Sequence, residues 1–214
     1  MPLQNRVDPA GQLIFTPARG MLMGNRGKIH NKNKEVFKPW DRLAWITCET
    51  QFKGIKREVF GANTYSELFF LDEATALSAG HRPCSDCRKP RLVEFKALWN
   101  LANSGETLPH DSSKAVRVSD IDEQLHAERI SSDGRKLTFD CLYGDVPSGV
   151  FILRDGKPHL RWMERLLLWT PEGYLPSPIS LSEGDIVTVL TPTSIFKMMA
   201  LGFIPKVHAS AEIG

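Results

Sequence analysis

The fold of this 214-residue chain is decided by one run, Glu67-Leu-Phe-Phe-Leu-Asp-Glu-Ala-Thr-Ala-Leu-Ser-Ala-Gly-His-Arg-Pro-Cys-Ser-Asp-Cys-Arg-Lys-Pro-Arg91. Its apolar start predicts a strand. Asp72 can cap a short helix over residues 73–79, because its carboxylate can accept the first free backbone N–H groups. Gly80 can end that helix in the left-handed conformation, and Pro90 suits the first position of a second helix. The run therefore predicts a strand, a short helix, a tight turn and another helix.

The turn of this run holds Cys84-Ser-Asp-Cys87. Two cysteines at this spacing can point their sulfurs at one ion, as they do in zinc sites. The chain has four cysteines, and its N-terminus shows no apolar signal-peptide segment. The sequence contains no run of about 18 apolar residues, so we expect no membrane-spanning helix. We therefore expect a cytoplasmic protein whose paired thiols bind metal rather than form a disulfide.

The phrase Ala76-Leu-Ser-Ala-Gly-His-Arg-Pro-Cys-Ser-Asp-Cys-Arg88 resembles the second half of the zinc-binding module of Ada, a family of bacterial alkylation-repair proteins. The resemblance covers about residues 45–91, and it implies Zn²⁺, DNA as the partner, and transfer of a methyl group from a DNA phosphotriester to a zinc-bound thiolate. The whole chain is also similar to a family of uncharacterised bacterial proteins, which implies no function.

The resemblance gives three metal ligands, Cys48, Cys84 and Cys87, with Cys48 as the methyl acceptor. The module's upstream cysteine pair is reduced here to Cys48, and the family's helix-turn-helix and Pro-Cys-His-Arg motif are absent. A tetrahedral site needs a fourth ligand. His81, three residues before Cys84, is the nearest candidate along the chain, and the other candidates are Cys141, His30, His126 and His208.

Charge is divided along the chain. Residues 1–91 hold 15 Lys and Arg against 9 Asp and Glu, whereas residues 92–214 hold 12 against 16. A net charge of 15 − 9 = +6 in the half with the C-x-x-C turn favours a polyanion as partner. The predicted nucleic-acid contacts are Lys53, Arg57, Arg82, Arg88, Lys89 and Arg91, of which Arg82 and Arg88 bracket the turn as a possible phosphate rim. The alternative is an ordinary solvated surface.

Two other functions stay open. In the first, the protein is a metal-dependent hydrolase or nuclease that uses His30, His126 or His208 with Glu58 or Glu128 around the metal. His126 is the favoured catalytic residue of that reading, because Asp122 lies four residues before it on a predicted helix and could orient the imidazole. In the second, zinc is purely structural in a protein-interaction module.

The predicted fold is α+β, with a small antiparallel sheet and zinc knuckle followed by a mostly β half. We expect an irregular arm over residues 1–20, strands over 43–48, 52–60 and 65–71, and a glycine-bounded loop, Gly24-Asn-Arg-Gly27, that could hold a phosphate but reads more simply as a surface turn. A polar loop over residues 104–113 suggests two domains, 1–108 and 109–214, or one continuous core. The oligomeric state is not indicated.

Overall fold

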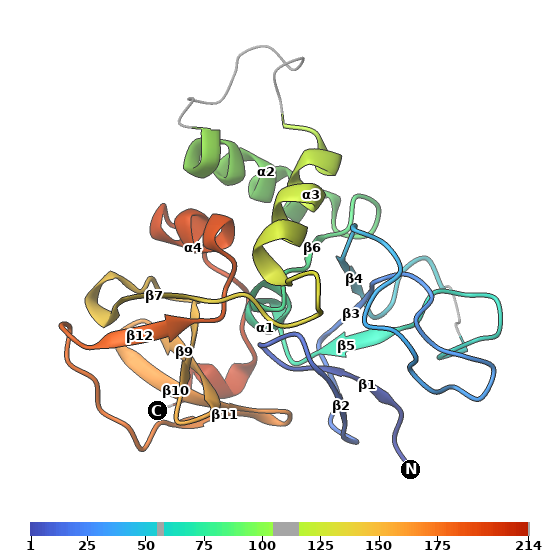
Figure 1. Ribbon diagram of the computed structural model, residues 1–214, viewed down its shortest axis with the longest axis horizontal. Coiled ribbons are helices and arrows are strands. Elements are labelled where there is room, and N and C mark those ends of the chain that lie inside the picture. Colours follow the sequence, from blue (N-terminus) through green and yellow to red (C-terminus); the bar gives the residue numbers. More distant parts are fainter. Residues whose placement is uncertain (55–57, 105–115, 214) are drawn as a thin grey trace.

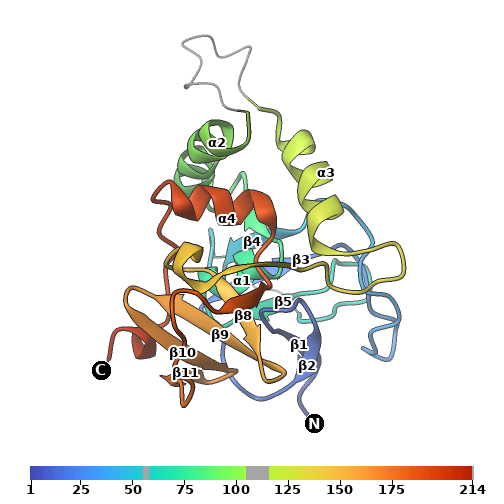
Figure 2. The ribbon, with the colours of Figure 1, turned by 60° about the vertical axis from the view of Figure 1, so that its left-hand side comes forward.

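The chain folds into two six-stranded sheets with helices packed between and beside them, so it is an α+β protein (Figure 1). The computed structural model describes residues 1–54, 58–104 and 116–213. The two views agree that α2, α3 and α4 lie together on one side of the sheets and that α1 lies between the sheets (Figures 1 and 2). Within the described residues, no helix is long and apolar enough to cross a membrane.

The first sheet is mixed and has the strand order β2-β1-β5-β3-β4-β6. Its strands are β1 (Gln4–Val7), β2 (Leu13–Phe15), β3 (Leu22–Asn25), β4 (Ile46–Glu49), β5 (Leu68–Phe70) and β6 (Arg82–Pro83). β1 runs parallel to β5, and β4 runs parallel to β6, while the other pairs are antiparallel. The predicted antiparallel sheet of the first half is therefore larger and of mixed direction.

The second sheet is antiparallel throughout, with the order β11-β10-β9-β8-β12-β7. Its strands are β7 (Phe139–Leu142), β8 (Phe151–Arg154), β9 (Lys157–Trp162), β10 (Arg165–Thr170), β11 (Gly173–Pro176) and β12 (Ile186–Val189). Asp155 and Gly156 join β8 to β9 with φ of 52° and 71°. Two positive φ values in succession are what a type I′ hairpin requires, so the predicted turn is confirmed.

The helices are α1 (Glu73–Ser78), α2 (Lys89–Ser104), α3 (Val118–Arg129) and α4 (Thr193–Ala200), with short 3-10 turns η2 (Tyr143–Asp145) and η3 (Ala209–Ala211). The Thr75 amide donates to Asp72 Oδ1 over 2.8 Å, and Gly80 has a φ of 84°, which confirms the predicted start and end of the first helix. One apolar cluster contains Phe95 of α2, Leu125 of α3 and Ile152 of β8. Side chains from both sides of the polar loop thus share a core, while the loop itself lies outside the described residues.

Several sequence predictions are wrong in detail. The expected arm over residues 1–20 contains β1 and β2, because Val7 packs into the apolar cluster of the first sheet, a tertiary contact that local composition does not show. The described parts of 52–60 form turns and no strand, with φ of 53° at Lys53.

Candidate metal centre

Three of the predicted ligands meet in space. The Sγ atoms of Cys48, Cys84 and Cys87 all lie within 4.8 Å of one another, and no further His, Cys, Asp or Glu of the described residues joins them. The parallel pairing of β4 with β6 explains this contact. Thr47 lies opposite Pro83, and the Cys84 amide donates to the Thr47 carbonyl over 2.9 Å. The residue after each partner is a cysteine, so the sheet register brings together thiols that are 36 positions apart (84 − 48).

The thiols lie in a mostly apolar corner of the first sheet. Cys48 is 8% exposed and Cys84 is 9% exposed, while Cys87 is less deeply buried. Their shell consists of the side chains Met23, Ile46, Tyr65 and Phe69. Such a shell excludes water from the sulfurs, which strengthens their interaction with a cation.

Cys84 is the sulfur that loses its proton first. A hydrogen bond from the Cys48 thiol, assisted by the backbone N–H of Asp86 at 3.4 Å, lowers the pKa of Cys84 to about 5 although burial opposes this shift. The pKa of Cys48 is raised, first by its hydrogen bond to Cys84 and then by burial, and burial raises the pKa of Cys87. The hydrogen bonds among the thiols thus favour the thiolate at Cys84, and a bound cation would favour ionisation of the other two thiols.

The structure does not bring His81 to the thiols. His81 is fully buried, its Nε2 accepts from Arg26 Nε over 3.3 Å, and its ring packs against Trp45 and Phe70. Burial, together with Arg26, Arg129 and Lys136, lowers its pKa well below the usual value.

The remaining candidates for a fourth ligand also lie elsewhere. His30 contacts the hydroxyl of Ser66 over 2.6 Å and stacks on Phe60. Cys141 is part of β7 and packs beside the apolar cluster that α2, α3 and β8 share. His208 does fold back toward the first half, but its amide donates to Asp72, at the start of α1, over 2.9 Å.

The arginines predicted as a phosphate rim are held by carboxylates of the protein itself. Both Oδ atoms of Asp122 accept from Arg82, over 2.7 and 2.8 Å, and Arg82 is 5% exposed. Glu73 accepts from Arg88 over 2.6 Å and from Arg91 over 2.7 Å. Although burial opposes it, these two cations lower the pKa of Glu73. The three guanidinium groups thus serve to fix α1, α2 and α3 around the thiols.

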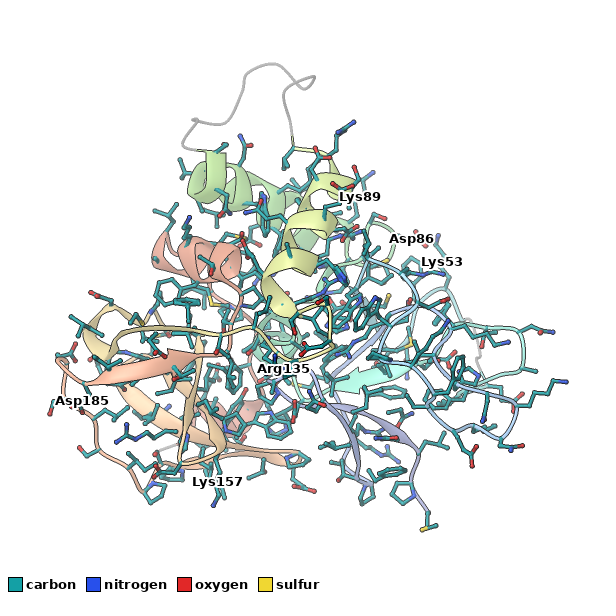
Figure 3. The ribbon with its side chains drawn as sticks, viewed as in Figure 1. Lys53, Asp86, Lys89, Arg135, Lys157 and Asp185 are labelled. Atoms are coloured by element: carbon teal, nitrogen blue, oxygen red, sulfur yellow. The ribbon has the colours of Figure 1, made fainter. Side chains whose placement is uncertain are left out.

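Two predicted basic contacts remain at the surface beside the metal centre. Lys53 and Lys89 are exposed. Lys53 forms a solvent-exposed ion pair with Asp86, at 3.6 Å, and its ammonium lies 4.7 Å from the centroid of the Phe52 ring. Figure 3 shows Lys53, Asp86 and Lys89 at the same edge of the molecule. A cavity of about 360 Å³ also reaches the centre, with Cys87, Glu49 and Lys206 among its lining residues. Arg57 lies outside the described residues.

His126 is not arranged as a metal-bound or carboxylate-oriented base. Both carboxylate oxygens of Asp122 accept hydrogen bonds from Arg82 and do not orient His126. The Nδ1 atom of His126 instead lies 3.1 Å from an Arg129 nitrogen. Its ring packs edge-on against Trp40 and Trp45. The carboxylates of the hydrolase alternative are likewise engaged away from the thiols: Glu58 pairs with Lys34 at 3.0 Å, and Glu128 accepts from the Ser194 amide over 2.8 Å.

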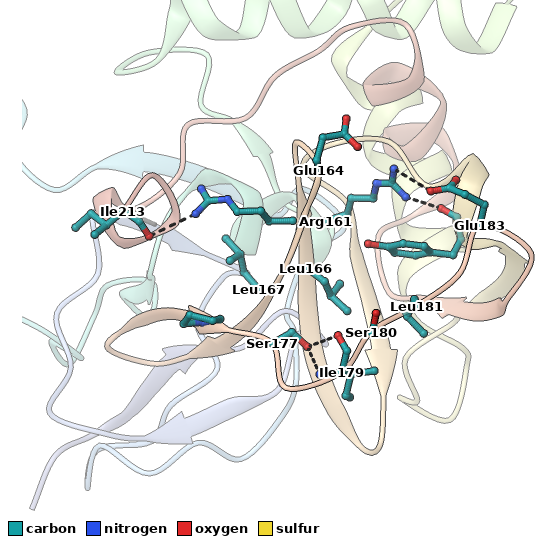
Figure 4. Close-up of a pocket in the computed structure, with 13 residues that line it drawn as sticks. Arg161, Glu164, Leu166, Leu167, Ser177, Ile179, Ser180, Leu181, Glu183 and Ile213 are labelled. Carbon is teal, nitrogen blue, oxygen red and sulfur yellow. Dashed lines mark hydrogen bonds and ion pairs between the residues drawn. The ribbon is translucent and has the colours of Figure 1, made fainter.

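A cavity larger than the one at the thiols lies elsewhere among the described residues. It has a volume of about 500 Å³ and lies on the second sheet, beside β9 and β10 (Figure 4). Its two central arginines already have partners: Arg161 donates to the Tyr143 carbonyl over 2.9 Å, and Arg165 donates to the Ala211 carbonyl. We therefore place the candidate site at the thiols, whose chemistry is specific for metal binding, and not at this larger cavity.

Sequence reasoning missed the residues that organise the centre. Glu73 joins α1 to α2 and also accepts from the Lys206 amide over 2.9 Å. Arg26, which the sequence places in a surface turn, is 2% exposed. No local signal distinguishes these residues from surface charges, because their partners come from distant parts of the chain.

Comparison with known proteins adds no identity to this geometry. The chain matches no protein-family model, and no curated protein or solved structure matches it significantly.

Proposed function

We propose that this chain is a zinc-binding protein whose first sheet binds nucleic acid beside the metal. The observation that carries the proposal is the cluster of three sulfurs within 4.8 Å. Thiolates are the preferred ligands of Zn²⁺ in structural sites, and a C-x-x-C pair with a third cysteine from a neighbouring strand is a common source of them. The ion would tie β4 and β6 to the start of α2, three segments that otherwise share few apolar contacts.

The coordination number leaves room for chemistry. Three protein ligands and one exchangeable position are typical of reactive zinc sites, whereas four protein ligands are typical of structural ones. Cys87 lines the cavity of about 360 Å³, so a ligand in this cavity would lie next to the centre. The fourth position in this proposal is taken by water or by the nucleic-acid substrate.

Two features support nucleic acid as the partner in this proposal: the positive charge of the first 91 residues and the resemblance to the Ada zinc-binding module. The first 91 residues carry a net charge of 15 − 9 = +6, and Lys53 and Lys89 present part of this charge beside the thiols. The Ada-like phrase from Ala76 to Arg88 supports DNA as the form bound.

Methyl transfer extends the same proposal. A zinc-bound thiolate would attack the methyl carbon of a DNA methylphosphotriester, forming the S–C bond as the C–O bond breaks, and the phosphodiester would leave with the electron pair. The resemblance assigns the acceptor role to Cys48, which is 8% exposed. Cys87 is the more exposed sulfur and is the acceptor if substrate approaches from the cavity.

Elemental analysis tests the metal. We expect about one zinc per chain in the wild type and loss of zinc in Cys48→Ser, Cys84→Ser and Cys87→Ser. Cys141→Ser is the matched control, because this cysteine lies on β7 and outside the thiol cluster. Full zinc occupancy in the Cys84→Ser protein would refute the proposal.

A salt titration tests the partner. Binding of short double-stranded DNA should weaken linearly with the logarithm of salt concentration, and Lys53→Ala with Lys89→Ala should reduce the slope by about two, one for each lost phosphate contact. The control is Lys157→Ala with Lys197→Ala, which removes two exposed lysines from the other half. An equal effect of the two double variants would indicate nonspecific attraction rather than a site. Mass analysis of the protein after incubation with methylated DNA then identifies any alkylated cysteine.

A further inference from the structure

A second group of cations, from both halves of the chain, gathers around Arg26, away from the thiols. Arg26 is 2% exposed and Arg129 is 1% exposed, and their guanidinium carbons lie 3.8 and 4.0 Å from the ring centroid of Trp45. Lys136 approaches from the loop after α3 and donates to the Ser78 carbonyl. We call Arg26, Arg129 and Lys136 the inner cations. Cation–π contact with Trp45 compensates only part of the free energy of burying the two guanidinium groups.

The inner cations lack matching anions. Asp122, the carboxylate nearest to Arg129, already forms a two-pronged ion pair with Arg82. Asp8 is the carboxylate that acts on Arg26 and Lys136. Because burial lowers the pKa of Lys136 to about 7, the two arginines are the lasting cations above that pH, and against Asp8 alone they keep an excess charge of 2 − 1 = +1. A buried charge of this size is expensive unless something neutralises it.

Hydrogen-bond donors in this group are also left over. Arg26 Nη2, Arg129 Nε and His81 Nδ1 are buried and have no hydrogen-bond partner among the described residues. His81 Nε2 accepts from Arg26, so its Nδ1 is the nitrogen that carries the proton. All three unpartnered nitrogens are therefore hydrogen-bond donors. An acceptor with negative charge would satisfy both these donors and the positive charge around them.

A cavity of about 290 Å³ lies beside Arg26, whereas Arg129 and Lys136 are not among its lining residues. Arg26 forms part of its wall, next to Gly11 of the turn between β1 and β2. A Cβ atom added at Gly11 would lie 3.7 Å from Arg26 Nη2, so the glycine leaves the unpartnered nitrogen covered only by backbone. The turn between β1 and β2 meets the segment after α3 near the middle of the molecule, where Figure 3 labels Arg135.

The outer part of the cavity is of different character. Leu13, Val36, Phe37 and Pro39 line it with apolar surface, and the Phe37 side chain is 60% exposed. Gln12 and Lys38 supply polar groups at the same wall. A ligand that fits would place an anionic group on Arg26 and an apolar group against Phe37.

We propose that this cavity binds a small organic phosphate monoester, with its phosphate on Arg26 and its organic part against Phe37. A phosphate monoester carries close to two negative charges at neutral pH and several acceptor oxygens, so it can both neutralise the excess positive charge and accept from a guanidinium group. Guanidinium presents parallel N–H donors to phosphate oxygens, and Nη2 of Arg26 is the donor that is free. This site is independent of the thiols and of the proposed zinc.

Titration calorimetry with two probes, inorganic phosphate and phenyl phosphate, tests the proposal on the full chain. We expect both to bind and phenyl phosphate to bind more tightly, because only it contacts Phe37. Arg26→Met should weaken both probes by about tenfold to a hundredfold, the effect of losing a charge-assisted hydrogen bond. Phe37→Ala should weaken phenyl phosphate alone. Arg19→Met, which alters an exposed arginine, is the matched control and should change neither affinity.

Two outcomes would overturn the proposal: no binding of either probe at millimolar concentration, or equal affinities in the wild type and Arg26→Met. Arg26 is buried, so its replacement could disturb folding, and the Phe37→Ala and Arg26→Lys proteins provide the second test. Arg26→Lys keeps the charge but removes the fork, and we expect it to bind both probes more weakly than the wild type. Unchanged phenyl phosphate affinity in both of these variants would also refute the site.

Discussion

Two groups of buried or partly buried cations differ in how their charge is balanced. Arg82, Arg88 and Arg91, beside the thiols, are held by Asp122 and Glu73 in close ion pairs. The inner cations, around Trp45, share mainly Asp8 and retain unpartnered nitrogens. The first group is satisfied by the protein and stabilises its architecture. The second group keeps unpartnered donors and positive charge, which suit it to the anionic ligand that we propose.

The difference teaches that a count of basic residues near a motif does not locate a binding surface. The arginines nearest the C-x-x-C turn in sequence are the ones that the fold neutralises, because α1 and α3 supply buried carboxylates there. Arg26 lies in a glycine-bounded segment that indicates only a turn, yet it is buried without an adequate counterion. Which cation is free depends on where the carboxylates lie, and that is set by tertiary packing.

Removing the proposed thiol-bound metal should give the largest effect and should separate the thiol region from the rest. Structural zinc contributes on the order of 10 kcal/mol in small zinc domains. After chelation, we expect faster amide hydrogen exchange in β4, β6 and the first turn of α2, with little change in β8, β9 and β10. Mass-spectrometric hydrogen exchange measures both. Equal loss of protection in the two sheets would show that the metal holds the whole molecule and not one corner.

Breaking one ion pair of the thiol region should turn a paired cation into an unpaired one. Asp122→Ala leaves Arg82 buried with its charge uncompensated, and we expect it to lower the free energy of unfolding by about 3–5 kcal/mol. Asp120→Ala is the control, two residues away on α3, because its pair with Arg117 is exposed to solvent and should contribute little. Urea unfolding measures both variants. Similar stability of the two variants would show that the buried pair is not what holds α3 to β6.

The inner cations should produce a smaller effect, visible as a dependence of stability on pH. Burial lowers the pKa of Lys136 from 10.5 to about 7, against the attraction of Asp8 and with repulsion from Arg26 and Arg129. Between these two pH values the unfolded chain binds the extra proton, so stability should rise as pH rises through this window. Burial also lowers the pKa of Arg26 and Arg129 to about 9, which extends the rise above that pH.

Lys136→Met isolates the lysine contribution to this slope. We expect the urea midpoint of the wild type to increase between pH 7 and pH 9 and that of Lys136→Met to stay nearly flat. Lys157→Met, an exposed lysine of β9, is the control and should follow the wild type. Parallel curves for wild type and Lys136→Met would show that Lys136 is solvated rather than part of the inner group.

The part of the fold that could be predicted rests on local rules. The Asp72 cap, the left-handed Gly80 and the Asp155-Gly156 hairpin depend on a few neighbouring residues, and the structure has them. The strands β1 and β2 could not be predicted in this way, because the segment around them is rich in glycine and proline. They join the sheet only because β1 pairs with β5 and β2 pairs with β1. The first residue of α3 has no side-chain cap hydrogen bond, so no local signal marks where this helix begins.

By itself, the sequence determined the pair Cys84 and Cys87, because two thiols at this spacing lie on one turn whatever the rest of the chain does. Only the tertiary structure decided that Cys48 joins them and that His81 does not. The parallel register of β4 and β6 carries Cys48 to the turn, while the side chain of His81 lies with Arg26 and Trp45. Ligand spacing within a turn is fixed by covalent geometry, whereas ligands from separate strands depend on a register that the whole sheet sets.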